Sequence, residues 1–217
     1  MRKFTRPLPP TKEGKIQLYG ELNKHAEKGQ IVFAGSSLME MFPIEEFVEE
    51  DGLSAIVYNR GVGGYVTSEL LEHVNTCITA LAPSKVFINI GTNDLSNPQM
   101  TISEIMRRYG EILEIVKRSV PDVKLYLMAY YPVNYSAASE EMKACLRIRT
   151  NQRIKQANQQ VAQLAECCGA EYIDVNAPLM DKDGNLKAEY TIEGMHINKD
   201  GYRAIYPLVR QYILKTA

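Results

Sequence analysis

Five short segments of the chain are apolar at nearly every position, and longer segments with helical periodicity lie between them. The apolar segments cover residues 31–35, 55–59, 85–91, 123–131 and 170–175. Such runs are typical of strands buried on both faces, and parallel strands need crossover helices between them. We expect a first helix at residues 15–28, before the strands, and further helices near residues 40–49, 66–80, 101–118, 140–168 and 199–214. The pattern predicts a three-layer α/β/α sandwich around a five-stranded parallel sheet.

The chain length sets the expected domain organisation. A chain of 217 residues can form one sizeable core and is short for two. We therefore expect a single domain over residues 1–217, in which residues 1–14 form an N-terminal arm. Two connections are longer than the others, residues 130–139 and 176–195. Long loops in compact domains are usually functional or mobile, so closure of the second loop over a substrate stays open.

The charge balance narrows the class of partner. The chain has 25 Lys and Arg residues against 26 Asp and Glu residues. It therefore has no net positive field to attract nucleic acid or an anionic membrane, and a small or neutral substrate is favoured. The basic N-terminus is followed by no apolar run, and no apolar stretch reaches the roughly 20 residues that span a bilayer. We expect a cytoplasmic protein that binds neither nucleic acid nor membrane.

The cysteines give no sign of a metal site. Cys77, Cys145, Cys167 and Cys168 contain no C-x-x-C pair, and the two vicinal residues fall in a predicted helix, where both sulfurs cannot face one metal ion. We expect reduced thiols, with no structural disulfide, no zinc and no other metal or cofactor.

Candidate chemistry gathers at the ends of the predicted strands. Gly35-Ser36-Ser37-Leu38 follows the first strand, residues 59–64 (NRGVGG) follow the second, and residues 91–94 (GTND) follow the third. Residues 193–196 (EGMH) precede the last helix. In a doubly wound parallel sheet, ligands bind at the carboxyl edge, so these loops are expected to meet there.

Each loop also has a structural interpretation. The two serines can cap the following helix, Asn93 and Asp94 can shape a turn, and His196 can be an ordinary surface histidine. The glycines of NRGVGG suggest a dinucleotide loop, but the G-x-G-x-x-G pattern would need glycine where Val66 stands. The joint occurrence of these blocks, at three strand ends and before the last helix, is harder to explain in structural terms alone.

The first and last of these loops resemble the SGNH hydrolases, also called the GDSL esterase/lipase family. The family block Gly-Asp-Ser-Leu is matched with Ser36 in place of aspartate, which makes Ser37 the expected nucleophile. The block Asp-x-x-His is matched in its spacing by Glu193 and His196, with glutamate as the acid. The resemblance implies that His196 is the general base and that Glu193 orients it; a Ser37–His196 dyad is the alternative if Glu193 points elsewhere.

The two middle loops complete the resemblance, which covers nearly the whole chain. Residues 59–64 match the Asn-x-Gly-x-x-Gly turn, and residues 91–94 match Gly-x-Asn-Asp in full. The resemblance implies a flavodoxin-like fold. It also implies an oxyanion hole made of the backbone N–H groups of Ser37 and Gly64 and the side-chain amide of Asn93, with no cofactor.

Residues beside these blocks are expected to have structural or pocket-lining roles and not to react. Asp94 and Thr92 are expected to shape their loop, and Arg60 to pack or cap beside the glycine turn. The three tyrosines after the fourth strand can line an acyl or alcohol pocket or belong to the core, namely Tyr130, Tyr131 and Tyr135.

These observations favour an enzyme. The resemblance, in particular to the branch of platelet-activating factor acetylhydrolase and carbohydrate acetylesterases, implies a serine esterase that cleaves a short-chain, preferably acetyl, ester through an acyl-enzyme, with thioesters left open. The alternative from another class is a catalytically silent protein of the same fold that binds an acylated or glycosylated small molecule. A nucleotide-binding module would rest on the glycine turn alone. The expected partner is a small-molecule ester, and whether the protein forms a homodimer is left open.

Overall fold

The structure is a computed structural model that describes residues 7–215. Residues 1–6 of the predicted arm lie outside the described residues. The strands are β1 (Ile31–Gly35), β2 (Val57–Gly61), β3 (Lys85–Asn89), β4 (Lys124–Met128) and β5 (Glu171–Ile173). The helices are α1 (Lys12–Asn23), α2 (Ser37–Glu40), α3 (Ile44–Glu50), α4 (Thr67–Glu72), α5 (Val74–Cys77), α6 (Ile102–Ser119), α7 (Glu140–Leu146), α8 (Asn151–Cys167) and α9 (Lys199–Leu214).

The five strands form one parallel sheet in the order β2-β1-β3-β4-β5. This is the flavodoxin-like strand order, in which the winding direction reverses between β1 and β3. The prediction of a five-stranded parallel α/β sandwich is therefore confirmed. The carboxyl ends of β1 and β3 lie side by side at the reversal, which is where a ligand is expected.

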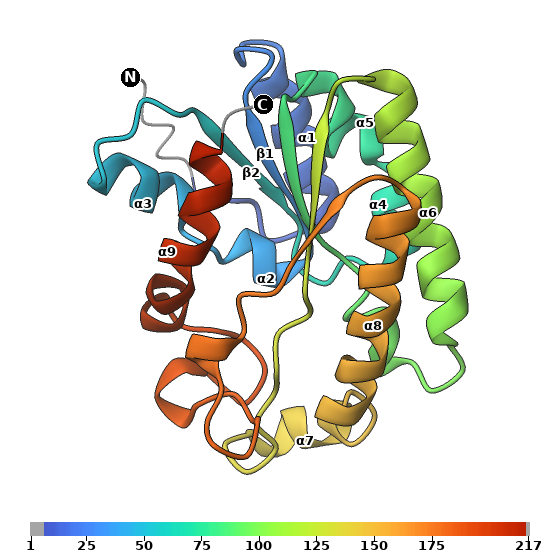
Figure 1. Ribbon diagram of the computed structural model, residues 1–217, viewed down its shortest axis with the longest axis vertical. Helices are drawn as coiled ribbons and strands as arrows, with labels where there is room; N and C mark the ends of the chain where they lie inside the picture. Colours follow the sequence, from blue (N-terminus) through green and yellow to red (C-terminus); the bar gives the residue numbers. More distant parts are fainter. Residues whose placement is uncertain (1–6, 216–217) are drawn as a thin grey trace.

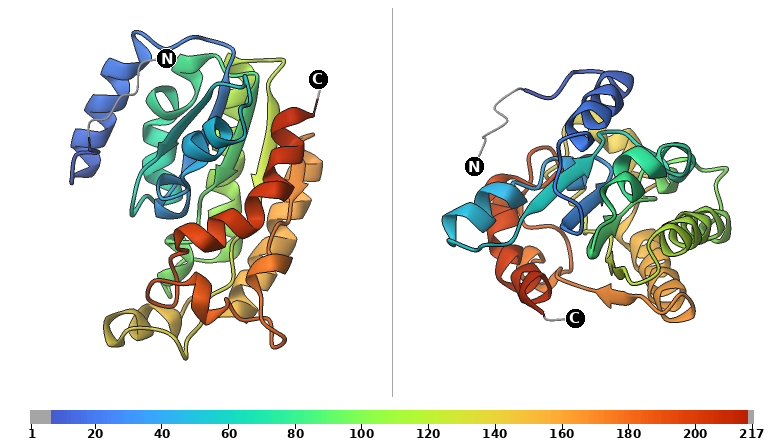
Figure 2. Two further views of the ribbon diagram at one scale, coloured as in Figure 1. Left: turned by 90° about the vertical axis from the view of Figure 1, so that its left-hand side faces the viewer. Right: turned by 90° about the horizontal axis from the view of Figure 1, so that it is seen from above.

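Helices cover both faces of the sheet (Figure 1). One buried cluster packs α1, α4, α5, α6 and α8 against the sheet, and the other packs α2, α3 and α9 against the opposite face. Strand residues alternate between these clusters: Val32 and Val86 belong to the first, Phe33 and Phe87 to the second. This alternation follows from the two-residue period of a strand. The view from above shows the same three layers (Figure 2, right).

An aromatic ladder crosses the sheet on the face covered by α9. Phe33, Phe87 and Tyr126 are paired in register on β1, β3 and β4. Their rings are stacked, with centroids 4.5 Å apart for Phe33–Phe87 and 4.8 Å apart for Phe87–Tyr126. Stacked aromatic side chains combine a large buried area with favourable ring geometry, so this ladder stabilises the centre of the sheet.

Two predicted element boundaries at the N-terminal side differ from the structure. The first helix covers Lys12–Asn23 rather than residues 15–28, because the Thr11 side chain accepts a hydrogen bond from the Gly14 N–H at 3.1 Å and starts the helix early. The second strand covers Val57–Gly61 rather than residues 55–59. It includes Asn59 and Arg60, whose side chains find partners on other elements, as described below.

Three predicted helices are divided in the structure. The segment 140–168 consists of α7 and α8, because the Thr150 side chain accepts from the Arg153 N–H at 3.2 Å and caps a new helix. The segment 66–80 consists of α4, α5 and a 3₁₀ turn. The segment 40–49 begins at the last residue of the short α2 and continues, after a break, into α3. Helices α6 and α9 agree closely with prediction. No helix within residues 7–215 is both long and apolar enough to cross a membrane.

The aromatic ladder generates a stability prediction. Replacing Phe87 with Ala removes the middle ring and leaves a cavity, so the free energy of unfolding should fall by about 3–5 kcal/mol. Replacing it with Leu should cost less, because most of the volume is kept. Urea denaturation measures both, and Leu214→Ala, at an exposed position, is the control. An F87A variant as stable as L214A would contradict the role of the ladder.

Candidate active site

The two serines after β1 have different environments. Ser36 is fully buried, and its hydroxyl has no hydrogen-bond partner among the described residues. Its carbonyl accepts from the Glu40 N–H at 2.9 Å, which starts α2 without any help from its side chain. Ser37 is the first residue of α2 and is half-exposed. The capping interpretation of the serine side chains is therefore wrong for Ser36, and Ser37 is the hydroxyl that solvent can reach.

Ser37, His196 and Glu193 form a continuous hydrogen-bonded chain. The Ser37 Oγ lies 2.9 Å from His196 Nε2, and His196 Nδ1 lies 2.7 Å from Glu193 Oε1. A carboxylate only accepts, so Nδ1 carries the ring proton and Nε2 is free to accept from the serine hydroxyl. The arrangement can take a proton from Ser37 and stabilise the resulting imidazolium.

A tight turn allows the longer glutamate to reach the histidine. Glu193 Oε1 also accepts from the His196 backbone N–H at 3.1 Å, and the Thr191 hydroxyl donates to the His196 carbonyl at 3.0 Å. The turn is held against the loop after β4, because the Asn134 N–H donates to the Gly194 carbonyl at 2.7 Å. Glu193 therefore lies against His196, and the separate dyad is not the arrangement in the structure.

Three candidate hydrogen-bond donors lie on Ser37 itself and on the loops after β2 and β3, the strands that flank β1. Within residues 7–215, the backbone N–H groups of Ser37 and Gly64 have no acceptor. The Asn93 amide nitrogen donates one hydrogen to the Tyr65 carbonyl at 2.9 Å, which leaves the other hydrogen available. Because Tyr65 directly follows Gly64 in the chain, this hydrogen bond links the loop of Gly64 to Asn93. Such unpartnered donors can stabilise an oxyanion that forms at the carbon attacked by Ser37.

The glycine turn after β2 is held by a buried ion pair. Glu40 Oε2 accepts from the Gly63 N–H at 2.6 Å, and the Lys15 Nζ lies 2.8 Å from the same carboxylate. Lys15 is only 8% exposed, an unusual position for a lysine, and it is neutralised by Glu40. Because a carboxylate occupies the position where a dinucleotide phosphate would bind the turn, the nucleotide-binding interpretation receives no support.

Helix α1 makes further contacts with the same turn. The Tyr19 hydroxyl donates to the Gly61 carbonyl at 2.7 Å, and burial raises the pKa of this phenol, which stays protonated. Lys12 pairs with Glu69 at 2.7 Å and lies over the Tyr65 ring. From the sequence we expect Lys12 in the N-terminal arm and Lys15 in a polar helix, neither with a role at the site. Their partners, Glu69 for Lys12 and Glu40 for Lys15, cannot be recognised from the local sequence pattern.

Arg149 also went unrecognised in the sequence. It is 3% exposed, and its Nη2 donates to Asn93 Oδ1 at 2.8 Å. The residue falls in the segment predicted as one helix over 140–168, but it lies in the break between α7 and α8. The N-cap signal of Thr150 was present in the sequence and could have indicated this break.

The remaining predicted residues have structural contacts. Asp94 accepts from the Thr67 N–H and hydroxyl, and burial raises the pKa of its carboxyl. Tyr130 and Tyr131 are buried in the core, whereas Tyr135 is exposed. Arg60 is buried between the rings of two tyrosines and donates to Asn23 Oδ1. Among the described residues, no cluster of three or more acidic, histidine or cysteine side chains could hold a metal ion.

The hydrogen-bonded chain predicts how the acid affects the serine. Replacing Glu193 with Gln should slow labelling of Ser37 by a fluorophosphonate roughly 10²- to 10⁴-fold, because an amide cannot stabilise the imidazolium that forms. Glu193→Asp, which keeps the charge, should be affected less. Mass spectrometry follows the labelling, with Glu189→Gln at an exposed position of the same loop as control. Equal labelling rates for E193Q and E189Q would show that Glu193 has no such role.

Known proteins resemble this chain in sequence and in structure. A Streptococcus pneumonia protein of known structure, described as a candidate platelet activating factor, is 32% identical, with 93% of this chain and 92% of that chain covered and a TM-score of 0.82. The bovine isoamyl acetate-hydrolyzing esterase 1 homolog is 26% identical over 174 residues, which are 72% of this chain and 70% of the relative.

A third relative is larger. The N-acylneuraminate cytidylyltransferase of Escherichia coli O18:K1:H7 is 24% identical over 200 residues, which cover 88% of this chain. The chain spans less than half of that relative, 44% of its length.

The family match includes most of the site. Residues 45–204 match the GDSL-like Lipase/Acylhydrolase family. This range contains Gly64, Asn93, Glu193 and His196, while Ser37 precedes it. The match covers well over half of the chain, and the relatives include an esterase. The chain therefore belongs to the GDSL-like lipase/acylhydrolase family.

Proposed function

We propose that this protein is a serine esterase that removes short acyl groups, preferably acetyl, from a small-molecule ester through an acyl-enzyme. The observation that carries the proposal is the 2.9 Å contact between the Ser37 hydroxyl and His196 Nε2, with His196 bonded in turn to Glu193. This geometry provides a nucleophile, a base and an orienting acid in hydrogen-bond contact.

In the proposed first step, Ser37 Oγ attacks the ester carbonyl carbon as His196 Nε2 accepts its proton. The carbonyl oxygen becomes an oxyanion, which accepts hydrogen bonds from the Ser37 and Gly64 N–H groups and the Asn93 amide. When the oxyanion collapses, the bond to the alkoxy group breaks, and His196 returns the proton to the leaving alcohol. Ser37 then carries the acyl group.

In the second step, water takes the place of the serine as nucleophile. His196 accepts a proton from the water as it attacks the acyl carbon, and the same three donors bind the new oxyanion. Collapse releases the carboxylic acid and returns the proton to Ser37. The same base and the same three donors act in both steps, because both steps form a negative charge on the same oxygen.

The acetyl preference has separate support. The bovine relative is named for hydrolysis of isoamyl acetate, which is an acetate ester of a small alcohol. The alcohol part of the substrate is not proposed, because its binding depends on the loops around the site.

The nucleophile is tested with p-nitrophenyl acetate. Turnover should vanish in Ser37→Ala and persist in Ser36→Ala, because the Ser36 hydroxyl has no partner to lose. Comparison of acetate, butyrate and octanoate esters measures the acyl preference, and the acetate should give the highest kcat/KM. A folded wild type with no turnover on any of these esters would favour the silent binding protein over the proposed enzyme.

The oxyanion donors give an independent prediction. Replacing Asn93 with Ala should lower kcat roughly 10²- to 10³-fold with little change in KM, because the lost hydrogen bond forms mainly in the transition state. The matched control is Asn97→Ala, an exposed asparagine a few residues further along the same loop. A loss confined to KM would assign Asn93 to ground-state binding instead.

A further inference from the structure

Arg149 is a buried cation that is not bonded to a carboxylate. Within residues 7–215 it forms no direct ion pair; its side chain hydrogen-bonds to Asn93, Ser96 and Met195, and the carboxyl of Asp94 acts on its charge from a greater distance. Burial lowers the pKa of its guanidinium, which nevertheless stays charged at neutral pH. Burying a charge that has no directly bonded counter-charge is unfavourable. The position therefore calls for an explanation beyond packing.

The contacts of Arg149 join the loops that carry the site. Nη2 donates to Asn93 Oδ1 at 2.8 Å, and Nε donates to the Ser96 hydroxyl at 2.8 Å, both in the loop after β3. Nη1 points to the sulfur of Met195, the residue before His196. A thioether sulfur is a weak hydrogen-bond acceptor, so this contact stabilises the guanidinium only slightly. The strongest polar contacts of the guanidinium are on the loop of the oxyanion donor.

The contact with Asn93 selects one orientation of its amide. The two ends of an asparagine side chain have nearly the same shape, so a 180° flip would place the oxygen where the nitrogen should be. Here the nitrogen donates to the Tyr65 carbonyl at 2.9 Å while the oxygen accepts from Arg149. A flipped amide would face two acceptors together at Tyr65 and two donors together at Arg149. Arg149 and the Tyr65 carbonyl thus hold the Asn93 amide with its nitrogen toward the loop of Gly64 and Tyr65.

We propose that Arg149 is a positioning residue of the oxyanion hole: it orients the Asn93 amide and supplies, through it, a positive charge that stabilises the anionic intermediate. A charge-assisted bond to Oδ1 polarises the amide and makes its N–H a stronger donor. The effect grows as negative charge develops on the substrate, and it therefore acts mainly in the transition state. This inference rests on the proposed esterase function.

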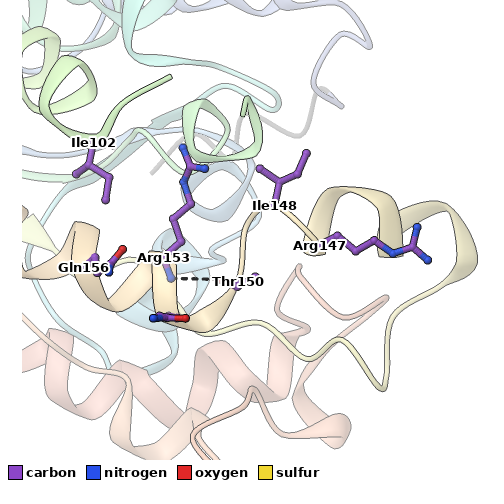
Figure 3. A pocket seen from close by; sticks show the side chains of 7 residues that line it. Ile102, Arg147, Ile148, Thr150, Arg153 and Gln156 are labelled. Carbon is purple, nitrogen blue, oxygen red and sulfur yellow. Dashed lines mark hydrogen bonds between the residues drawn. The ribbon is translucent and has the colours of Figure 1, made fainter. Parts of the chain in front are cut away.

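The neighbouring arginines provide a matched control. Arg147 and Arg153 line an open pocket of ≈ 540 Å³ together with Ile102, Ile148 and Thr150 (Figure 3). Arg147 is exposed and donates to the Tyr135 hydroxyl at 3.2 Å. It lies only two residues from Arg149 and has no contact with Asn93, so Arg147→Met changes the same side chain without touching the oxyanion hole.

The test compares Arg149→Met, Arg149→Lys and Arg147→Met on p-nitrophenyl acetate. We expect R149M to lower kcat by more than about tenfold and by no more than Asn93→Ala, since it acts through that residue. The KM of R149M should stay within about twofold of the wild-type value. The kcat of R149K, which keeps the charge but not the planar guanidinium, should lie between those of the wild type and R149M. R147M should match the wild type.

A double mutant separates this role from a purely structural one. In the Asn93→Ala background, R149M should lower kcat by less than about twofold, because the residue it acts through is gone. An equal loss in both backgrounds, or kcat values for R149M and R147M that agree, would overturn the inference. Thermal unfolding checks that each variant is folded, and R149K carries the comparison if R149M does not fold.

Failure of the proposed function gives a different pattern. If the wild type hydrolyses none of the esters but Ser37 is still labelled by a fluorophosphonate, the labelling rates of the same variants replace kcat, since that reaction also places an anionic oxygen in the hole. R149M should then be labelled more slowly than R147M, and equal rates would overturn the inference. A folded wild type inert in both assays would remove the proposed function and this inference with it.

Discussion

Close contact between backbones at the carboxyl edge of the sheet is the constraint on which the site depends. A side chain at Gly35 would collide with the carbonyl oxygen of Asn89, at the end of β3, and a side chain at Gly61 would collide with the backbone of Glu40. Only glycine lets the turn from β1 into α2 pass between the ends of β2 and β3 at this spacing. Ser37 consequently lies between the loop of Gly64 and the loop of Asn93. Ser37, the proposed nucleophile, is positioned by main-chain packing more than by any contact of its own side chain.

The parts of the fold that the sequence predicts well are those with local signals. Helix α6 begins where the Thr101 side chain accepts from Glu104 N–H at 3.1 Å, and α9 begins where Asn198 accepts from Gly201 N–H at 3.0 Å. Strand β2 is harder to delimit, because Arg60 is charged and yet forms part of the strand beyond the predicted end at residue 59. Its guanidinium donates to Asn23 Oδ1 at 3.1 Å, a partner 37 residues away. Hydrophobic pattern alone cannot reveal a charged strand residue that is satisfied by a distant element.

The same distinction separates the predictable from the unpredictable residues of the site. Strand topology brings Ser37, Gly64 and Asn93 to one edge, so motifs at the strand ends suffice to nominate them. Lys15 binds Glu40 across 25 residues, and Arg149 binds Asn93 across 56 residues. Neither partner can be read from a local pattern, since each depends on how two connections fold back on the sheet. Direct contacts at strand ends follow from topology, whereas the residues that support them require the tertiary structure.

The supporting residues also differ in their electrostatic effect. Lys15 is paired with Glu40, so its charge is neutralised and the pair acts as a clamp on the Gly63 N–H. Together with Tyr19 on Gly61, it ties the glycine turn to helix α1. The order of this turn is therefore established on folding and need not be established when substrate binds, which is the condition under which fixed donors stabilise a transition state. Arg149 is bonded to no carboxylate among the described residues; its guanidinium bonds Asn93 Oδ1, and the carboxyl of Asp94 offsets its charge only from a distance. One side of the proposed oxyanion site is thus held by a neutral clamp and the other by a cation without a bonded carboxylate, so we expect the positive field at the proposed intermediate to come from the side of β3.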